Sequence, residues 1–210
     1  LYKKEGSMAR KTSLAHAMGK LSDACMTEGS AGALERMNAL RRRAFALREE
    51  IAKEDPSPKN IRRFLNACED LGDACRDQGT KESLKEAYEL YERALKLREE
   101  MLEQEDTVAD RWRLADACKG FGMICERIGS LPMLQKAEEL FARAQELYVQ
   151  TDHIKKSVSS RKDVARILMR RGGLCAVRQR GGSFERAVGY YRNAAALYEQ
   201  LMRELGTADS

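Results

Sequence analysis

The chain has 210 residues, of which 43% are hydrophobic and 34% are charged, and its formal net charge is +5. This length allows one large domain or two small ones, and the composition is that of a globular protein with an apolar core rather than a disordered one. Three prolines, 6% aromatic residues and abundant Ala, Leu, Glu, Arg and Lys favour helices over a β-sandwich or barrel. No apolar run approaches the roughly 20 residues that cross a bilayer.

The first seven residues precede Met8 and are typical of a translated cloning linker. We therefore treat 1–7 as a linker and 8–210 as a single domain. The sequence around Met8 has no apolar segment with a small-residue cleavage site, so we expect a cytoplasmic protein.

The cysteines reveal an internal repeat. Their positions recur at intervals of 50 residues, in one set of four and one set of two: Cys25, Cys75, Cys125 and Cys175, then Cys68 and Cys118. Residues 11–60 and 61–110 share 14 identities without a gap, where residue frequencies give about three by chance. The sequence thus predicts four repeats, at about 8–58, 59–107, 108–156 and 157–207.

Each repeat contains two amphipathic helical patterns separated by a glycine. In chain order the patterns predict helices near 9–27, 31–53, 59–78, 82–104, 108–128, 132–150, 157–179 and 183–205. A glycine column ends the first helix of three repeats, and a hydroxyl column caps the second: Gly29, Gly79 and Gly129, then Ser30, Thr80 and Ser130. In the fourth repeat the glycines move to Gly181 and Gly182, and Ser183 is the expected cap.

The cysteines lie on the apolar stripes of these helices. A disulfide framework is typical of small exported domains, and a zinc site commonly uses Cys-x-x-Cys spacing. Cys68 and Cys75 are instead seven residues apart, which is two helical turns. We predict free, buried thiols that pack as small hydrophobic side chains, with no metal site.

The repeat columns resemble the tetratricopeptide repeat, and in particular its long bacterial variety of about 50 residues. The matching positions of the second and third repeats are Cys68, Leu71, Gly72, Cys75, Ala87, Tyr91 and Ala94, then Cys118, Phe121, Gly122, Cys125, Ala137, Phe141 and Ala144. The first repeat departs from the pattern with Ser22, Met37 and Arg41, the fourth has Arg171 at the leucine column, and the closing proline column is missing. The resemblance implies an all-α, right-handed superhelical array of four hairpins.

Stacking is also expected from the apolar pattern alone. A single hairpin cannot bury both of its broad apolar stripes, whereas neighbouring hairpins can cover each other and form one continuous core. The glycine column at Gly72 and Gly122 is expected to let the paired helices approach closely.

The resemblance further implies that the first helix of each hairpin lines a concave groove for an extended or helical peptide. The inward-facing columns of this chain give the candidate groove residues Asn66, Glu69, Asp70, Asp73, Asp77, Asp116, Lys119, Met123, Arg166 and Arg170, with His16, Lys20, Asp23 and Met169 as further members. Residues 61–110 carry a formal charge of −6 and residues 161–210 carry +5. The predicted function is a binding scaffold for a protein or peptide of mixed charge; the alternative is that these residues form solvated polar faces.

The sequence gives less support to other functions. Neither His16 nor His153 has an evident partner, neighbouring carboxylates diverge on their helices, and no phosphate loop or nucleophile elbow is present, so we predict neither an enzyme nor a cofactor. RNA binding by the basic fourth repeat is a further alternative, although the acidic second repeat interrupts any basic stripe. Apolar residues surround much of the last helix, so self-association is another: Phe184, Tyr190, Tyr191, Leu197, Tyr198, Leu201, Met202 and Leu205. The chain could also be part of a larger signalling protein.

Overall fold

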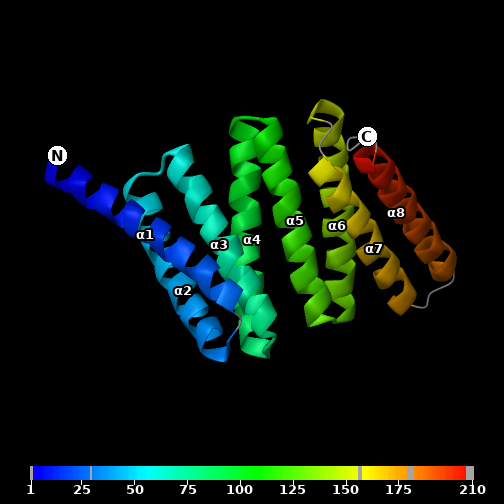
Figure 1. Cartoon of the computed structure of the whole chain (residues 1–210), viewed down its shortest axis with the longest axis horizontal. Helices are drawn as coiled ribbons and strands as arrows, with labels where there is room; N and C mark the ends of the chain where they lie inside the picture. Colours follow the sequence, from blue (N-terminus) through cyan, green and yellow to red (C-terminus); the bar gives the residue numbers. More distant parts are fainter. Residues whose placement is uncertain (1, 29, 156–157, 179–181, 207–210) are drawn as a thin grey trace. The chain divides into compact units, whose positions relative to one another are not determined.

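The structure is a computed structural model that describes residues 2–28, 30–155, 158–178 and 182–206. These described residues form eight α-helices and no strand (Figure 1). The helices are α1 (Tyr2–Glu28), α2 (Ala31–Glu54), α3 (Pro58–Gln78), α4 (Lys81–Gln104), α5 (Val108–Ile128), α6 (Leu131–Lys155), α7 (Val158–Arg178) and α8 (Ser183–Gly206). The all-α class is confirmed, and the predicted bounds of α2–α5, α7 and α8 agree with the structure to within one residue.

The chain divides into two compact units, residues 1–97 and 98–210, and α4 passes from one to the other. In the first unit α1 packs on α2, and α2 packs on α3. In the second unit α5 pairs with α6, α7 pairs with α8, and α6 packs on α7. Within each unit consecutive helices run in opposite directions, so the repeats form helical hairpins, as their sequence pattern predicts (Figure 1).

The helix ends follow the glycine and hydroxyl columns. Gly79 and Gly129 adopt positive φ angles of 70° and 75° and donate their backbone N–H groups to Cys75 and Cys125. Ser30 and Thr80 accept hydrogen bonds from the backbone N–H groups three residues later, at 3.1 Å in both cases. Gly29 and Gly181, which the sequence also placed at helix ends, lie outside the described residues.

Three helix ends differ from the sequence predictions. Helix α1 begins at Tyr2 rather than near residue 9, so the segment read as a linker continues the helix. Helix α6 extends to Lys155 rather than ending near residue 150, and buried Thr151 in the added part donates its hydroxyl hydrogen to the carbonyl oxygen of Tyr148. Ser183 is the first residue of α8 and not its cap, since the carbonyl oxygen of Gly182 accepts the N–H of Arg186.

Glycine brings the two helices of a hairpin together, as predicted for Gly72 and Gly122. A Cβ atom added to Gly72 would lie 2.7 Å from the ring of Tyr91, and one added to Gly122 would lie 2.6 Å from the ring of Phe141. The fourth repeat shows the same arrangement. The glycine column therefore seats an aromatic ring from the second helix directly on the backbone of the first.

The cysteines are free thiols, and five of the six are buried in the core; Cys175 is half-buried. Burial raises the pKa of Cys75 to about 11 and that of Cys118 to about 12. These two thiols therefore stay protonated at neutral pH and pack as hydrophobic groups, as the stripe pattern predicts.

Candidate functional site

The acidic candidates lie on α3, in the first unit. Asp73 accepts a hydrogen bond from the Tyr91 hydroxyl at 2.9 Å, which ties this carboxylate to α4. Arg76 binds both Asp73, at 2.7 Å, and Asp77, at 2.9 Å. The negative charge predicted for this helix is thus partly neutralised by an arginine from within it.

A pocket of about 360 Å³ lies beside these groups in the first unit. Asp73 and Asp77 line it together with Arg76, Arg41 and apolar residues of α1 and α2. Of the remaining predicted α3 residues, Asn66 and Glu69 do not line this pocket. Asp70 does not line it either, but its carbonyl oxygen accepts a hydrogen bond at 3.1 Å from Arg41, which does.

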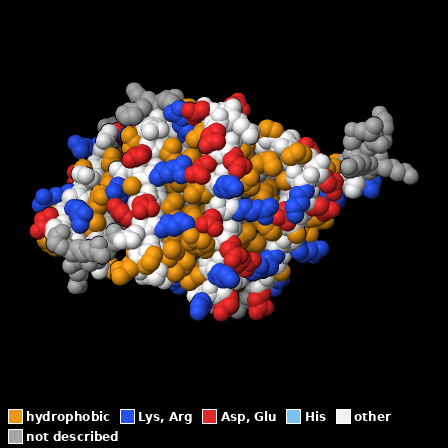
Figure 2. Space-filling view, turned by 180° about the vertical axis from the view of Figure 1, so that it is seen from behind, with side chains coloured by type: hydrophobic (Ala, Val, Ile, Leu, Met, Phe, Trp, Pro, Cys, Tyr) orange, Lys and Arg blue, Asp and Glu red, His pale blue; other side chains and the backbone are white. Residues whose placement is uncertain are grey.

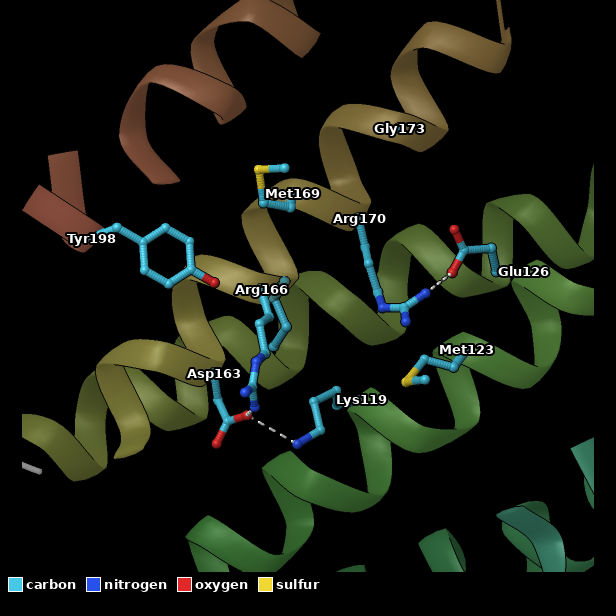
Figure 3. A pocket seen from close by; sticks show the side chains of 10 residues that line it. Lys119, Met123, Glu126, Asp163, Arg166, Met169, Arg170, Gly173 and Tyr198 are labelled. Carbon is cyan, nitrogen blue, oxygen red and sulfur yellow. Dashed lines mark hydrogen bonds and ion pairs between the residues drawn. The ribbon is translucent and has the colours of Figure 1, made fainter. Parts of the chain in front are cut away.

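A larger pocket of about 580 Å³ lies in the second unit, between α5 and α7, with Tyr198 of α8 at its edge (Figure 3). Its lining includes five residues that the sequence places in a groove: Lys119, Met123, Arg166, Met169 and Arg170. Asp116 does not line the pocket, but its carboxylate lies 2.5 Å from the Lys119 ammonium and accepts the Tyr148 hydroxyl at 3.0 Å. The basic part of the predicted site is therefore brought together in one place.

Most of the positive charge in this pocket is already paired. The Lys119 ammonium lies 3.2 Å from the buried carboxylate of Asp163, and Arg170 binds Glu126 at 2.6 Å. Arg166 lies 3.5 Å from the same Asp163 oxygen, and its side chain is 66% exposed. A guanidinium with one long ion pair and open solvent is the group best able to accept a new carboxylate.

Apolar side chains line the same pocket. Met169 is 47% exposed, Tyr198 is also exposed, and Met123 is half-buried. Figure 3 shows the Arg166 guanidinium beside Asp163 and Lys119, with Tyr198, Met169 and Met123 farther away in the same pocket. The pocket thus combines an available cation with thioether and aromatic surfaces that can take an apolar side chain.

Sequence reasoning missed Glu126, Asp163 and Tyr198 in this pocket. Lys119 and Asp163 are 44 residues apart, as are Glu126 and Arg170. This separation is slightly less than one repeat, and it is the signal that could have identified both pairs. Tyr198 stands 50 residues after Tyr148, at the same repeat position.

The remaining candidates are distributed more widely. His16, Lys20 and Asp23 are exposed on α1, and Lys20 pairs with Asp23 at 3.7 Å. The side chain of His153 lies outside the described residues. Among the described residues, no group of three or more His, Cys, Asp or Glu could hold a metal ion.

The surface charges of both signs are intermixed. Figure 2 shows Lys and Arg side chains next to Asp and Glu side chains on this face, with apolar side chains visible between them. In the basic fourth repeat, Arg170 and Arg171 are bound to Glu126 and Glu138. No described helix is long and apolar enough to cross a membrane.

Comparison with known proteins supports the fold. No protein-family model matches the chain, and no curated protein is significantly similar to it. Among solved structures, the "DHF58 filament" is 18% identical, with a TM-score of 0.54, and the match covers 98% of this chain and 100% of that one. The "de novo designed helical repeat protein DHR64" is 17% identical, with a TM-score of 0.49, covering 95% and 97%. The match to the first of these structures, together with the repeated hairpins, shows that the chain has a helical repeat fold.

Proposed function

We propose that this protein is a non-enzymatic scaffold that binds a peptide or protein segment, and that the α5–α7 pocket is its main binding site. The observation that carries this proposal is that the exposed Arg166 side chain lines the same pocket as Tyr198, Met169 and Met123. A segment with a carboxylate next to an apolar side chain fits this combination. The carboxylate binds Arg166, and the apolar side chain covers the methionines.

The resemblance to tetratricopeptide repeats supports the same function. In that family the first helix of each hairpin presents the ligand-binding surface, and α5 and α7 are the first helices of the third and fourth repeats. The acidic residues of α3 are a second part of the proposal. Their net negative charge attracts a basic segment, which together with the Arg166 pocket makes the proposed partner one of mixed charge.

The proposal is tested with fluorescein-labelled peptides of about a dozen residues that combine Glu with Leu, compared with peptides in which Lys replaces each Glu. We expect fluorescence polarisation to detect binding of the Glu–Leu peptides. Arg166→Glu is expected to weaken that binding at least about tenfold, because it replaces an attractive charge by a repulsive one.

The matched control is Arg127→Glu, which makes the same change on exposed α5 surface outside the pocket lining. It is expected to leave binding within about twofold of the original, since water and salt screen an exposed charge that does not contact the peptide. Equal binding of the Glu–Leu and Lys–Leu peptides, or equal loss in both variants, would remove the pocket from the proposal.

A second copy of the chain is a second candidate partner. Phe184 and Met202 are exposed on α8 in this structure. The similar solved structure is described as a filament, which is a property of that protein and makes self-association worth testing in this one. Sedimentation velocity over about two orders of magnitude in concentration provides the test, because an association equilibrium shifts with protein concentration. A mass that stays that of a monomer would contradict it.

A further inference from the structure

We infer that copies of this chain stack end to end, with the first hairpin (α1–α2) of one copy placed on the last hairpin (α7–α8) of another in the register of the internal repeats. This inference rests on the proposed self-association and adds its geometry. Hairpins within each unit show which repeat positions touch the preceding hairpin. The same positions can then be followed into the two end hairpins.

The first helix of a hairpin faces the preceding hairpin through one apolar position. In α3 this position is Phe64, which is 2% exposed and packs on Phe45 of α2 with ring centroids 5.6 Å apart. Fifty residues earlier, Leu14 occupies the position in α1 and is 47% exposed. The position opposite it in a second copy, 150 residues after Phe45, is Ala195, which is exposed on α8.

A second position of the repeat supports the same register, because the residues that would meet there are alike in polarity. In α7 it is Arg171, whose guanidinium binds Glu138 at 2.8 Å and Gln145 at 2.8 Å, both on α6 of the preceding hairpin. In α1 it is Leu21, which is 55% exposed. The residues 50 positions after Glu138 and Gln145 are Val188 and Ala195. The arginine thus meets polar partners, and the leucine would meet apolar ones.

A recurring ion pair provides charge complementarity. Glu49 of α2 pairs with Arg93 of α4 at 2.6 Å, and Glu99 of α4 pairs with Arg143 of α6, one repeat later. The next repeat has Val149 and Asn193 at these positions and cannot form the pair.

Continuing the register beyond α8 places Glu199 opposite Arg43 of a second copy. Both side chains are exposed, and the described structure gives neither of them an ion-pair partner. End-to-end stacking would therefore restore the pair that the third and fourth repeats lack.

The second helix of the last hairpin, α8, is more exposed than α6, the second helix of the hairpin before it. Phe141 of α6 is fully buried, whereas Tyr191, at the same position of α8, is 38% exposed. Both rings pack on a glycine of their own hairpin, so the contact with glycine does not explain why Tyr191 is more exposed than Phe141. What differs is that α7 packs on α6, while no described helix packs on α8 in the corresponding way.

One contact in this register is unfavourable. Arg42 of the first repeat forms an ion pair with Glu86 of the second. The equivalent positions between two stacked copies are Arg192 of one copy and Arg36 of the next, which carry the same charge. Arg36 is already bound to Glu28, with both carboxylate oxygens within 2.9 Å. The repulsion is thereby reduced, and we expect a moderate association that strengthens with protein concentration.

Because the two surfaces differ, the interface is heterologous, and the experiment exploits this. Leu21→Glu blocks the first-hairpin surface and leaves the last free; Ala195→Glu does the reverse. Both residues are exposed, so neither change creates a buried charge, and circular dichroism confirms helicity. Sedimentation velocity is then measured for each variant alone and for their equimolar mixture.

We expect each variant alone to be monomeric and the mixture to form a one-to-one dimer through the two unblocked surfaces. Glu199→Arg and Arg43→Glu should each weaken association of the unmodified chain about fivefold, and the double variant should recover it. Glu139→Arg, on exposed α6 surface, is the matched control and should have no effect.

The outcomes separate the register from self-association itself. If the unmodified chain stays monomeric at all concentrations, both proposals fail. If it associates but the two blocked variants still associate alone, or their mixture stays monomeric, the end-to-end register is wrong while self-association stands. Peptide binding by the α5–α7 pocket is independent of either result.

Discussion

The Nε atom of Arg41 donates a hydrogen bond to the hydroxyl of Ser22 at 3.1 Å. These two residues stand at the positions where the other three repeats have a glycine and an aromatic ring in close contact. The first repeat therefore keeps its helices together through a polar pair instead of a ring on bare backbone. In the sequence, the first repeat matches the repeat pattern least well. In the structure, Ser22 and Arg41 together replace the glycine and the aromatic residue of the other repeats.

This relationship predicts strong coupling between the two positions. Arg41→Tyr alone should destabilise the protein, because the new ring would meet the Cβ of Ser22. Ser22→Gly together with Arg41→Tyr recreates the pair of the second repeat and should recover stability. A double-mutant cycle by urea unfolding should give a coupling of roughly 0.5–3 kcal/mol. Additive effects of the two changes would contradict the pairing.

The close contact between Gly122 and the ring of Phe141 gives a second prediction. Gly122→Ala gains about 0.5–1 kcal/mol of helix propensity but forces a methyl group against the fully buried ring of Phe141, and overpacking costs about 1–3 kcal/mol. Net destabilisation is expected in urea unfolding. The matched control is Gly19→Ala in α1, where a Cβ would have no neighbour within 4 Å. That change should stabilise the protein, and equal effects of the two substitutions would refute the packing argument.

The cysteines predict an order of thiol reactivity. Burial raises the pKa of Cys75 to about 11 and that of Cys118 to about 12, so their reactive thiolate forms are scarce at neutral pH. Cys175 is half-buried and should be alkylated first. Mass spectrometry of the native protein during iodoacetamide treatment measures the order, and denatured protein is the control in which all six react. Early labelling of Cys118 in the folded chain would be inconsistent with its place in the core.

The ion pairs between successive hairpins predict a dependence on pH. Arg42 donates a hydrogen bond to Glu86 at 2.7 Å, and this bond is the main reason that the pKa of Glu86 lies below its ordinary value of 4.5. A lowered pKa in the folded state stabilises the protein above the unfolded value, and this stabilisation is lost as the pH falls through the folded pKa.

Arg42→Gln should therefore lower the melting temperature at neutral pH and have a smaller effect once Glu86 is protonated. Calorimetry at neutral pH and at a pH well below 4.5 makes the comparison. Lys96→Gln, at an exposed position in the middle of α4, is the control and should change neither value. A constant difference between Arg42→Gln and the original chain at every pH would exclude the ion pair as its cause.

Much of the fold could be predicted because the information is local. Helix positions follow from apolar periodicity, and Gly79 and Gly129 identify helix ends because a positive φ angle is easiest for glycine. The extension of α6 to Lys155 could not be predicted this way, because no glycine or proline in residues 151–155 indicates where the helix ends.

The candidate site could be predicted only in part. The repeat columns placed Lys119, Arg166 and Arg170 in one region, and the structure gathers them around one pocket. The carboxylate partners of Lys119 and Arg170, which are Asp163 and Glu126, come from a neighbouring hairpin. Which residues meet across hairpins depends on the stacking offset, and a single helix pattern does not contain that offset.

The central claim is that the α5–α7 pocket binds a segment carrying a carboxylate and an apolar side chain. NMR of the protein with ¹³C-labelled methionine methyl groups tests it most directly, because Met123 and Met169 line the pocket while buried Met37 and half-buried Met133 do not. Adding a Glu–Leu peptide should shift the signals of Met123 and Met169, leave those of Met37 and Met133 unchanged, and lose its effect in Arg166→Glu. Shifts confined to other methionines, or shifts that survive in Arg166→Glu, would contradict the account.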